Sequence, residues 1–133
     1  MPAQESDKLL PRIRRILVER PSCESIPPTD WIAQLRRIAS MHSDESTIRQ
    51  AEVFKALSDP TRLRVARLLS EKEELCVCEI QMALELTQPL TSHHLNILRR
   101  SGVVKAIKKE RWVHYKLNEG SRELLQLVQR ISG

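Results

Sequence analysis

The apolar residues of this chain follow a helical period almost throughout and change to strand-like alternation once, after Gly102. Before that glycine they recur at three- and four-residue spacing, which is typical of helices buried along one face. After it, residues 103–107 and 112–117 are rich in β-branched and aromatic side chains, with a polar segment between them. Two such runs predict a hairpin. We therefore expect a mainly α protein with a small β-hairpin.

Start and stop signals divide the helical part into segments. Potential capping residues precede five of them, namely Ser6, Thr29, Asp59, Thr87 and Asn118, and Gly102 is a C-terminal stop. The expected helices span residues 6–19, 30–40, 47–57, 60–70, 77–85, 88–101 and 119–131. We divide the chain into an N-terminal helical extension (1–46, a dimerisation arm), a core (47–118) and a C-terminal dimerisation helix (119–133).

The size and composition limit the class of protein. With 133 residues, the chain fits one domain with additional helices. It has no apolar run of about 18 residues, and its N-terminus lacks the basic-then-apolar pattern of a signal peptide, so we expect a cytoplasmic protein without membrane contact. Three cysteines, an odd number, argue against a disulfide framework and indicate thiols that are free or bind a ligand.

Positive charge is concentrated in one segment. Residues 1–54 carry eight bases and eight acids, whereas residues 99–116 carry seven bases and one acid, a local net charge of +6 against +5 for the whole chain. Such a patch on an otherwise balanced domain is typical of a protein that binds a polyanion, with nucleic acid the first candidate.

Two short helices joined at Leu86-Thr87 and followed by a basic hairpin form the pattern of a winged helix-turn-helix. On a helical wheel of residues 88–101, Thr91, His94, Leu95 and Leu98 face the core, while short polar and cationic side chains lie opposite. We read His94 as a core or hydrogen-bonded histidine. The candidate DNA-binding residues of the helix and wing are Gln88, Thr91, Ser92, His93, Asn96, Arg100, Lys105, Lys108, Lys109 and Arg111.

Three segments carry a family resemblance: AEVFKALSDPTRLRVARLL, ELCVCEI and LTQPLTSHHLNILRRSGVVKAIKKERWVHYKL. Together they resemble the ArsR/SmtB family of winged-helix metalloregulators over residues 51–117. The resemblance implies a dimeric repressor that releases operator DNA when it binds an inducer. By this resemblance, the family's Gln position falls on Gln88. Its Ser-x-His-Leu motif falls on Ser92, His94 and Leu95, and its basic recognition-helix position falls on His93. The hairpin tip departs from the family, which often has Gly where this chain has Glu110.

The ELCVC box of the arsenic- and cadmium/lead-responsive branches falls on Cys76 and Cys78 in this resemblance. Thiolates are soft ligands that select ions such as As(III), Cd(II) or Pb(II). On an ideal helix the two side chains lie about 200° apart, so one ion bridging both would unwind the first turn. At the position where the arsenic branch has a further cysteine, this chain has Gln81. A third sulfur would therefore come from Cys23, in an extension that resembles the cadmium/lead branch.

Several alternatives remain at this point. The same cysteines could form a disulfide, which would make the chain a redox-sensing regulator. A dithiol enzyme is a weaker alternative, because it needs no basic wing. A winged-helix module that binds protein is also weaker, because it predicts an apolar or mixed outer face on the helix 88–101. No G-x-S-x-G, P-loop or H-E-x-x-H motif indicates an enzyme. The last helix lacks histidine, so we expect no zinc site there, and no cofactor is needed for DNA binding.

Two amphipathic helices suggest a homodimer. Residues 9–17 and 124–131 each carry an apolar stripe that would be poorly solvated in a monomer. A symmetric homodimer joined by these stripes would present two DNA-reading helices to a near-palindromic operator.

Overall fold

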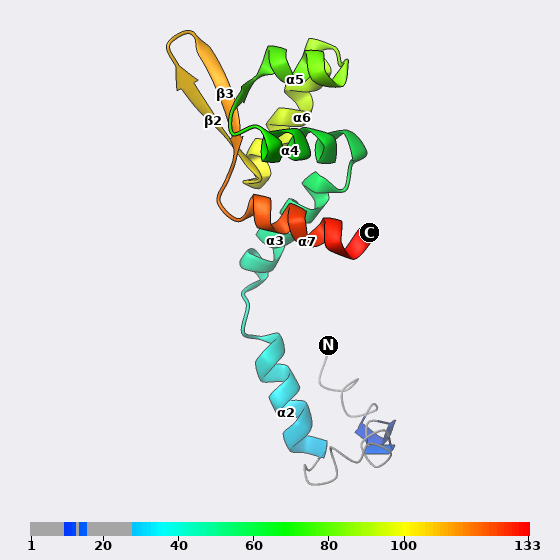
Figure 1. Ribbon diagram of the computed structural model, residues 1–133. Coiled ribbons are helices and arrows are strands. Elements are labelled where there is room, and N and C mark those ends of the chain that lie inside the picture. Colours follow the sequence, from blue (N-terminus) through cyan, green and yellow to red (C-terminus); the bar gives the residue numbers. More distant parts are fainter. Residues whose placement is uncertain (1–9, 13, 16–27) are drawn as a thin grey trace. The chain divides into compact units, whose positions relative to one another are not determined.

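The computed structural model describes residues 10–12, 14–15 and 28–133, and the chain divides into two compact units, Met1–Asp44 and Glu45–Gly133 (Figure 1). In the first unit, residues 10–12 and 14–15 are helical, and helix α2 spans Pro28–Ala39. The rest of the helix expected over residues 6–19, including Ser6, lies outside the described residues, as does Cys23. Because α2 begins at Pro28, Thr29 lies within the helix, and its prediction as a cap is wrong.

Among the described residues, the second unit contains five helices, of which the first begins at Asp44, one residue before the boundary between the units. These are α3 (Asp44–Leu57), α4 (Pro60–Glu71), α5 (Val77–Leu84), α6 (Gln88–Ser101) and α7 (Ser121–Ser132). Asp59 caps α4 as predicted, because its carboxylate accepts the backbone N–H of Arg62 at 3.0 Å. Proline follows at the first helical position, where it costs no hydrogen bond. No helix in the described part of the chain is long and apolar enough to cross a membrane.

The sheet has three antiparallel strands in the order β1-β3-β2. The expected hairpin is formed by β2 (Val104–Lys109) and β3 (Trp112–Leu117), with Val104 opposite Leu117 and Lys109 opposite Trp112. It projects from the helices of the second unit (Figure 1). β1 (Leu75–Cys76) pairs with the other edge of β3 and was not predicted, because a strand of two residues has no readable alternation. The winged helix-turn-helix fold is confirmed.

One hydrophobic core holds these elements together. Its fully buried side chains include Val65 and Leu69 of α4, Ile80 of α5, and Leu95 and Leu98 of α6. Contacts of α4 and α5 with α6 fix the position of α6, and contacts of α6 with β2 place the hairpin beside its C-terminal end. The two elements expected to contact DNA are therefore attached to the same core.

The connection from β3 to α7 differs from the prediction. Gly120, not Asn118, occupies the N-cap position of α7, with a φ of 88° that favours glycine. Asn118 instead donates its side-chain amide to the carbonyls of Gly102 and Val104 at 2.7 and 3.3 Å. Its amide thus joins the end of α6 to the start of the wing. Arg122 of α7 donates to the Ser70 carbonyl, which attaches α7 to the end of α4.

Candidate nucleic-acid interface and cysteine box

Helix α6 is fixed at both ends by the residues that the sequence indicated. At its start, the Thr87 hydroxyl accepts the backbone N–H of Leu90 at 3.3 Å. At its end, Gly102 has a φ of 87° and closes the helix through hydrogen bonds from its N–H to the Leu98 and Arg99 carbonyls. Because backbone groups at both ends of α6 are hydrogen-bonded, the helix presents its outer side chains in a defined geometry.

The inner face of α6 agrees with the helical wheel. Thr91, Leu95 and Leu98 are fully buried, and His94 is 8% exposed. Thr91 donates its hydroxyl to the Thr87 carbonyl at 2.8 Å, so its side chain stabilises the first turn. Including Thr91 among the DNA-binding residues is therefore corrected, because a fully buried side chain does not reach a base or a phosphate.

The outer face of α6 carries the remaining candidates. Gln88, His93 and Arg100 are exposed, and Ser92 and Asn96 are half-buried. Arg99, which is not among the predicted DNA-binding residues, donates to the Asn96 side-chain oxygen at 2.9 Å. This contact orients the Asn96 amide and adds a second cation beside Arg100. The face is polar and positively charged, as contacts with base edges and phosphates require.

The wing adds a second group of cations. Lys105, Lys108, Lys109 and Arg111 are all exposed. Lys109 also forms an ion pair with Glu74, with 2.8 Å between Nζ and Oε2. Glu74 precedes β1 and lies 35 residues from Lys109 in the sequence, so no local pattern could have revealed this pair. Glu110 forms the tip with a φ of 54°, a conformation in which a non-glycine residue is strained.

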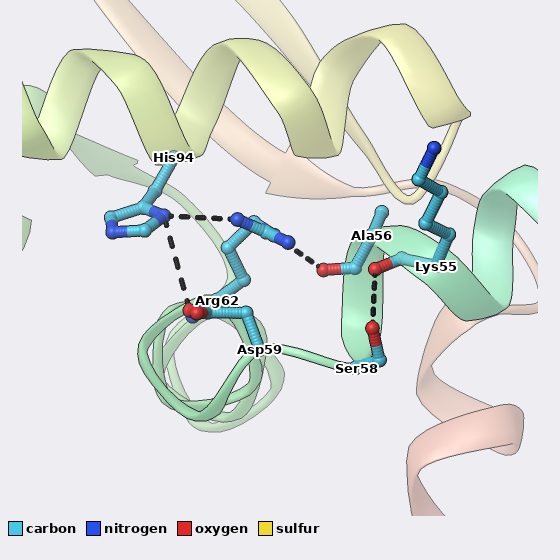
Figure 2. Close-up of polar contacts among 6 residues, drawn as sticks. All are labelled: Lys55, Ala56, Ser58, Asp59, Arg62 and His94. Atoms are coloured by element: carbon cyan, nitrogen blue, oxygen red, sulfur yellow. Dashed lines mark hydrogen bonds and ion pairs between the residues drawn. The ribbon is translucent and has the colours of Figure 1, made fainter.

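A polar network beneath α6 connects three helices (Figure 2). Arg62 of α4 donates its Nε to the Ala56 carbonyl of α3 at 2.6 Å, and its Nη1 lies 3.4 Å from Nδ1 of His94. Asp59 also lies near His94, with Oδ2 4.0 Å from Nδ1. The network joins α3 and α4 to the inner face of α6. The prediction of a hydrogen-bonded His94 is confirmed, but its partner Arg62 was not foreseen.

Burial decides the charge state of His94. It lowers the pKa of the imidazole below its ordinary value, and this effect outweighs the opposing attraction of Asp59. The nearby cation of Arg62 lowers the pKa further. A neutral imidazole can accept a hydrogen bond at Nδ1, so the guanidinium of Arg62 acts as the donor in this contact.

The two cysteines of the ELCVC box lie at the start of α5. Cys76 is the last residue of β1 and the N-cap of α5, with extended backbone, and Cys78 is the second residue of the helix. Cys76 is half-buried, and Cys78 is exposed. Because Cys76 lies outside the helix, the predicted angle of about 200° between two helical side chains does not apply, and the predicted unwinding of the first turn is wrong.

Charged and polar groups surround Cys76. Glu79 accepts its backbone N–H at 3.0 Å, and this bond is the main cause that lowers the pKa of the Glu79 carboxyl. Across the sheet, Cys76 is paired with His114 of β3. Within the described residues, no three His, Cys, Asp or Glu side chains are placed to hold a metal ion together. Cys76 and Cys78 offer two soft donors for a thiophilic ion, and a third sulfur would come from Cys23, which lies outside the described residues.

A helix-turn-helix with an exposed cationic face on its second helix, followed by a basic wing, defines a winged helix-turn-helix DNA-binding protein. Residues 59–106 match the model of the bacterial regulatory protein family arsR. An uncharacterised HTH-type transcriptional regulator of Methanocaldococcus jannaschii is 44% identical over 84 residues, which cover 62% of this chain and 94% of that protein. The chain belongs to the arsR family and is a transcriptional regulator of the ArsR/SmtB type.

Two further similarities extend this result. The arsenical resistance operon repressor of Escherichia coli is 49% identical over 67 residues, which cover 50% of this chain and 57% of that protein. The homodimeric winged helix-turn-helix domain of Mb0332 from Mycobacterium bovis superposes with a TM-score of 0.62 at 28% identity, over 70% of this chain and 89% of that one. The match to the arsenical repressor thus spans little more than half of that protein.

Proposed function

We propose that this protein is a homodimeric transcriptional repressor that binds operator DNA through α6 and the wing. The observation that carries the proposal is the outer face of α6, which is polar and cationic on a helix whose ends and inner face are fixed. In this proposal Gln88 and Ser92 read bases, and His93, Asn96 and Arg100 contact bases or phosphates, which the exposed or half-buried positions of these side chains support. Lys105, Lys108, Lys109 and Arg111 supply phosphate contacts. No part of this role requires catalysis or a bound cofactor.

Exposed apolar side chains support the homodimer. In α7, Leu127 and Ile131 are 48% and 86% exposed, while Leu125 of the same helix is buried. In α3, Ile48 and Phe54 are about as exposed, at 61% and 62%. Side chains of this type are usually covered in a stable protein, and a second copy of the chain covers them symmetrically. Of the proposed apolar stripe in residues 9–17, Leu9, Ile13, Ile16 and Leu17 lie outside the described residues.

The inducer in this proposal is a thiophilic ion, with As(III), Cd(II) and Pb(II) as the candidates, which binds Cys76 and Cys78 with help from Cys23. The position of the box supports this role, because α5 packs against α6 and Cys76 is the N-cap of α5. A ligand that moves Cys76 would therefore move the support of the DNA-reading helix. We expect it to lower operator affinity by about 1–3 kcal/mol, the usual size of an allosteric coupling.

Replacement of outward residues of α6 tests the DNA interface. Gln88→Ala and Ser92→Ala should each cost about 1–3 kcal/mol of operator affinity and relax sequence preference, because each would remove a base contact. Gln126→Ala, at an exposed position of α7, is the matched control. Unchanged operator affinity in both α6 variants would contradict the assignment of this face.

Serine variants test the inducer site, since serine keeps the approximate volume of cysteine and loses the soft sulfur. Cys76→Ser and Cys78→Ser should each still bind the operator but no longer release it on addition of As(III) or Cd(II). Cys23→Ser should give a partial loss if a third sulfur is used. Retained induction in the Cys76→Ser/Cys78→Ser double variant would refute the site.

The competing function is a redox-sensing repressor that forms a disulfide among the same cysteines. Release of the operator by peroxide but not by metal would establish it. If the reduced protein releases the operator on addition of metal but not on addition of peroxide, the protein is a metalloregulator. Thiolate charge-transfer absorbance during the titration reports directly whether the ion binds sulfur.

A further inference from the structure

Glu74 lies between the cysteine box and the wing. It belongs to the loop just before β1, two residues from Cys76, and its side chain is 21% exposed. Its Oε2 accepts from Lys109 Nζ at 2.8 Å, at the far end of β2. Its Oε1 is buried without a hydrogen bond and lies 3.5 Å from Nδ1 of His114 on β3. One carboxylate therefore contacts both strands of the wing.

Backbone contacts connect the same parts of the protein. β1 pairs with β3, so that Leu75 is opposite Tyr115 and Cys76 is opposite His114. β3 in turn pairs with β2 along its full length, which places Lys109 opposite Trp112 near the tip. A displacement of Cys76 would thus reach the wing through a ladder of hydrogen bonds and through the Glu74 side chain.

Electrostatics favour the ion pair between Glu74 and Lys109. The Glu74 carboxylate lies 2.8 Å from the Lys109 ammonium and 3.5 Å from Nδ1 of His114, so opposite charge and a direct hydrogen bond hold it against the wing. Within the described residues of the wing, Lys109 differs from Lys105, Lys108 and Arg111 in having an ion pair.

We propose that Glu74 is a positioning residue that couples the cysteine box to the wing, so that ligand binding at Cys76 and Cys78 changes the phosphate contacts of Lys109 and its neighbours. This inference rests on the proposed function. It gives the cysteine box a second connection to the DNA-binding surface, beside the packing of α5 against α6. In the ligand-free protein, Glu74 holds Lys109 and the wing in place. When β1 moves, Glu74 moves with it, and the wing loses its position relative to α6.

The test compares Glu74→Gln with Glu73→Gln. Both variants remove one negative charge from the same loop, but Glu73 is exposed and has no contact with Lys109 in the described structure. The readout is the ratio of operator dissociation constants with and without As(III) or Cd(II), which is about 5- to 150-fold for a typical coupling. We expect Glu74→Gln to reduce this ratio at least about threefold, and Glu73→Gln to leave it unchanged. Thiolate absorbance should show the same ion binding in both variants.

A double-mutant cycle with Lys109→Gln tests whether the effect passes through the ion pair. If it does, Glu74→Gln produces no further loss of response in the Lys109→Gln background. Equal losses in both backgrounds would overturn the proposed route. Unchanged thermal unfolding midpoints would show that the variants act on coupling and not on global stability.

Hydrogen exchange of the reduced, ligand-free protein examines the coupling without an inducer. Glu74→Gln should speed exchange of the β3 amides relative to Glu73→Gln, because the wing loses one attachment. Equal exchange in the two variants, together with an unchanged inducer response, would refute the inference. A wild-type protein that binds neither metal nor DNA would instead refute the proposed function, so the two failures are distinguishable.

Discussion

The guanidinium of Arg62 joins His94 on the inner face of α6 to the Ala56 carbonyl at the end of α3. Arg62 also belongs to the first turn of α4, which Asp59 caps. Three helices therefore meet at one side chain. The position of α6 depends on this polar junction as well as on the apolar core, and the two can be separated by substitution.

Arg62→Ala should destabilise the fold by about 1–3 kcal/mol, because it leaves the Ala56 carbonyl and His94 Nδ1 without their donor. Arg62→Lys should recover part of this loss, since an ammonium group can reach one acceptor but lacks the geometry to serve both. Urea unfolding measures both values. Arg64→Ala, on the exposed face of the same helix, is the control and should change stability by less than about 0.5 kcal/mol. Equal effects at the two arginines would contradict the junction.

The lowered pKa of His94 predicts how stability depends on pH. An unfolded histidine titrates at about 6.5, so below that pH the unfolded chain binds a proton that folded His94 does not. Its contribution is complete above about pH 6.5 and is lost as the pH falls from that value through the lower pKa of the folded state. Asp59 acts in the same direction at lower pH, because its pKa is depressed from an ordinary value near 3.8.

His94→Asn should therefore flatten the dependence of unfolding free energy on pH between about 7 and 5. Asparagine is suitable because its side-chain oxygen can accept from Arg62 in place of Nδ1. Urea unfolding at several pH values measures the slope. His42→Asn, at an exposed position outside the second unit, is the control substitution. A slope that His94→Asn leaves unchanged would show that His94 does not titrate between the two states as described.

Local patterns predicted much of the fold. Asp59, Thr87 and Gly102 act where the sequence places them, because capping depends on a few neighbouring residues. β1 and the ion pair of Glu74 with Lys109 were not foreseen, because they arise only when residues 35 to 40 positions apart meet. Arg62 was missed for the same reason. Its partner His94 is 32 positions away, and neither residue alone indicates the other.

In the candidate site too, the features set by local periodicity were predicted and those set by long-range contacts were not. The inner and outer faces of α6 follow from helical periodicity, and the structure agrees with them. Thr91 was misassigned because its residue type suits DNA contact, whereas its position buries it completely. The placement of Cys76 outside α5 depends on the pairing of β1 with β3, which the spacing of the two cysteines does not contain.

The wing predicts a specific pattern of salt dependence. Lys108→Gln and Arg111→Gln should each reduce the slope of operator affinity against salt by about 1, because each removes one phosphate contact. Lys109→Gln should reduce it less, since Lys109 is already paired with Glu74 in the free protein. Binding titrations at several salt concentrations, on operator and unrelated duplexes, measure the slopes. If all three lysine and arginine variants leave them unchanged, the wing does not contact phosphates.

The exposed apolar positions of α7 predict the state of assembly. Leu127→Glu and Ile131→Glu together should convert the dimer to a monomer at micromolar concentration, because a buried carboxylate in an apolar interface costs more than the contacts return. Gln126→Glu and Gln129→Glu add the same two charges at exposed positions of the same helix and should leave the dimer intact. Sedimentation measures the mass of each variant. Operator affinity should fall with dissociation, because a monomer contacts one half-site instead of two. A wild-type chain that sediments as a monomer would contradict the proposed homodimer, and a double variant that remains dimeric would place the interface elsewhere.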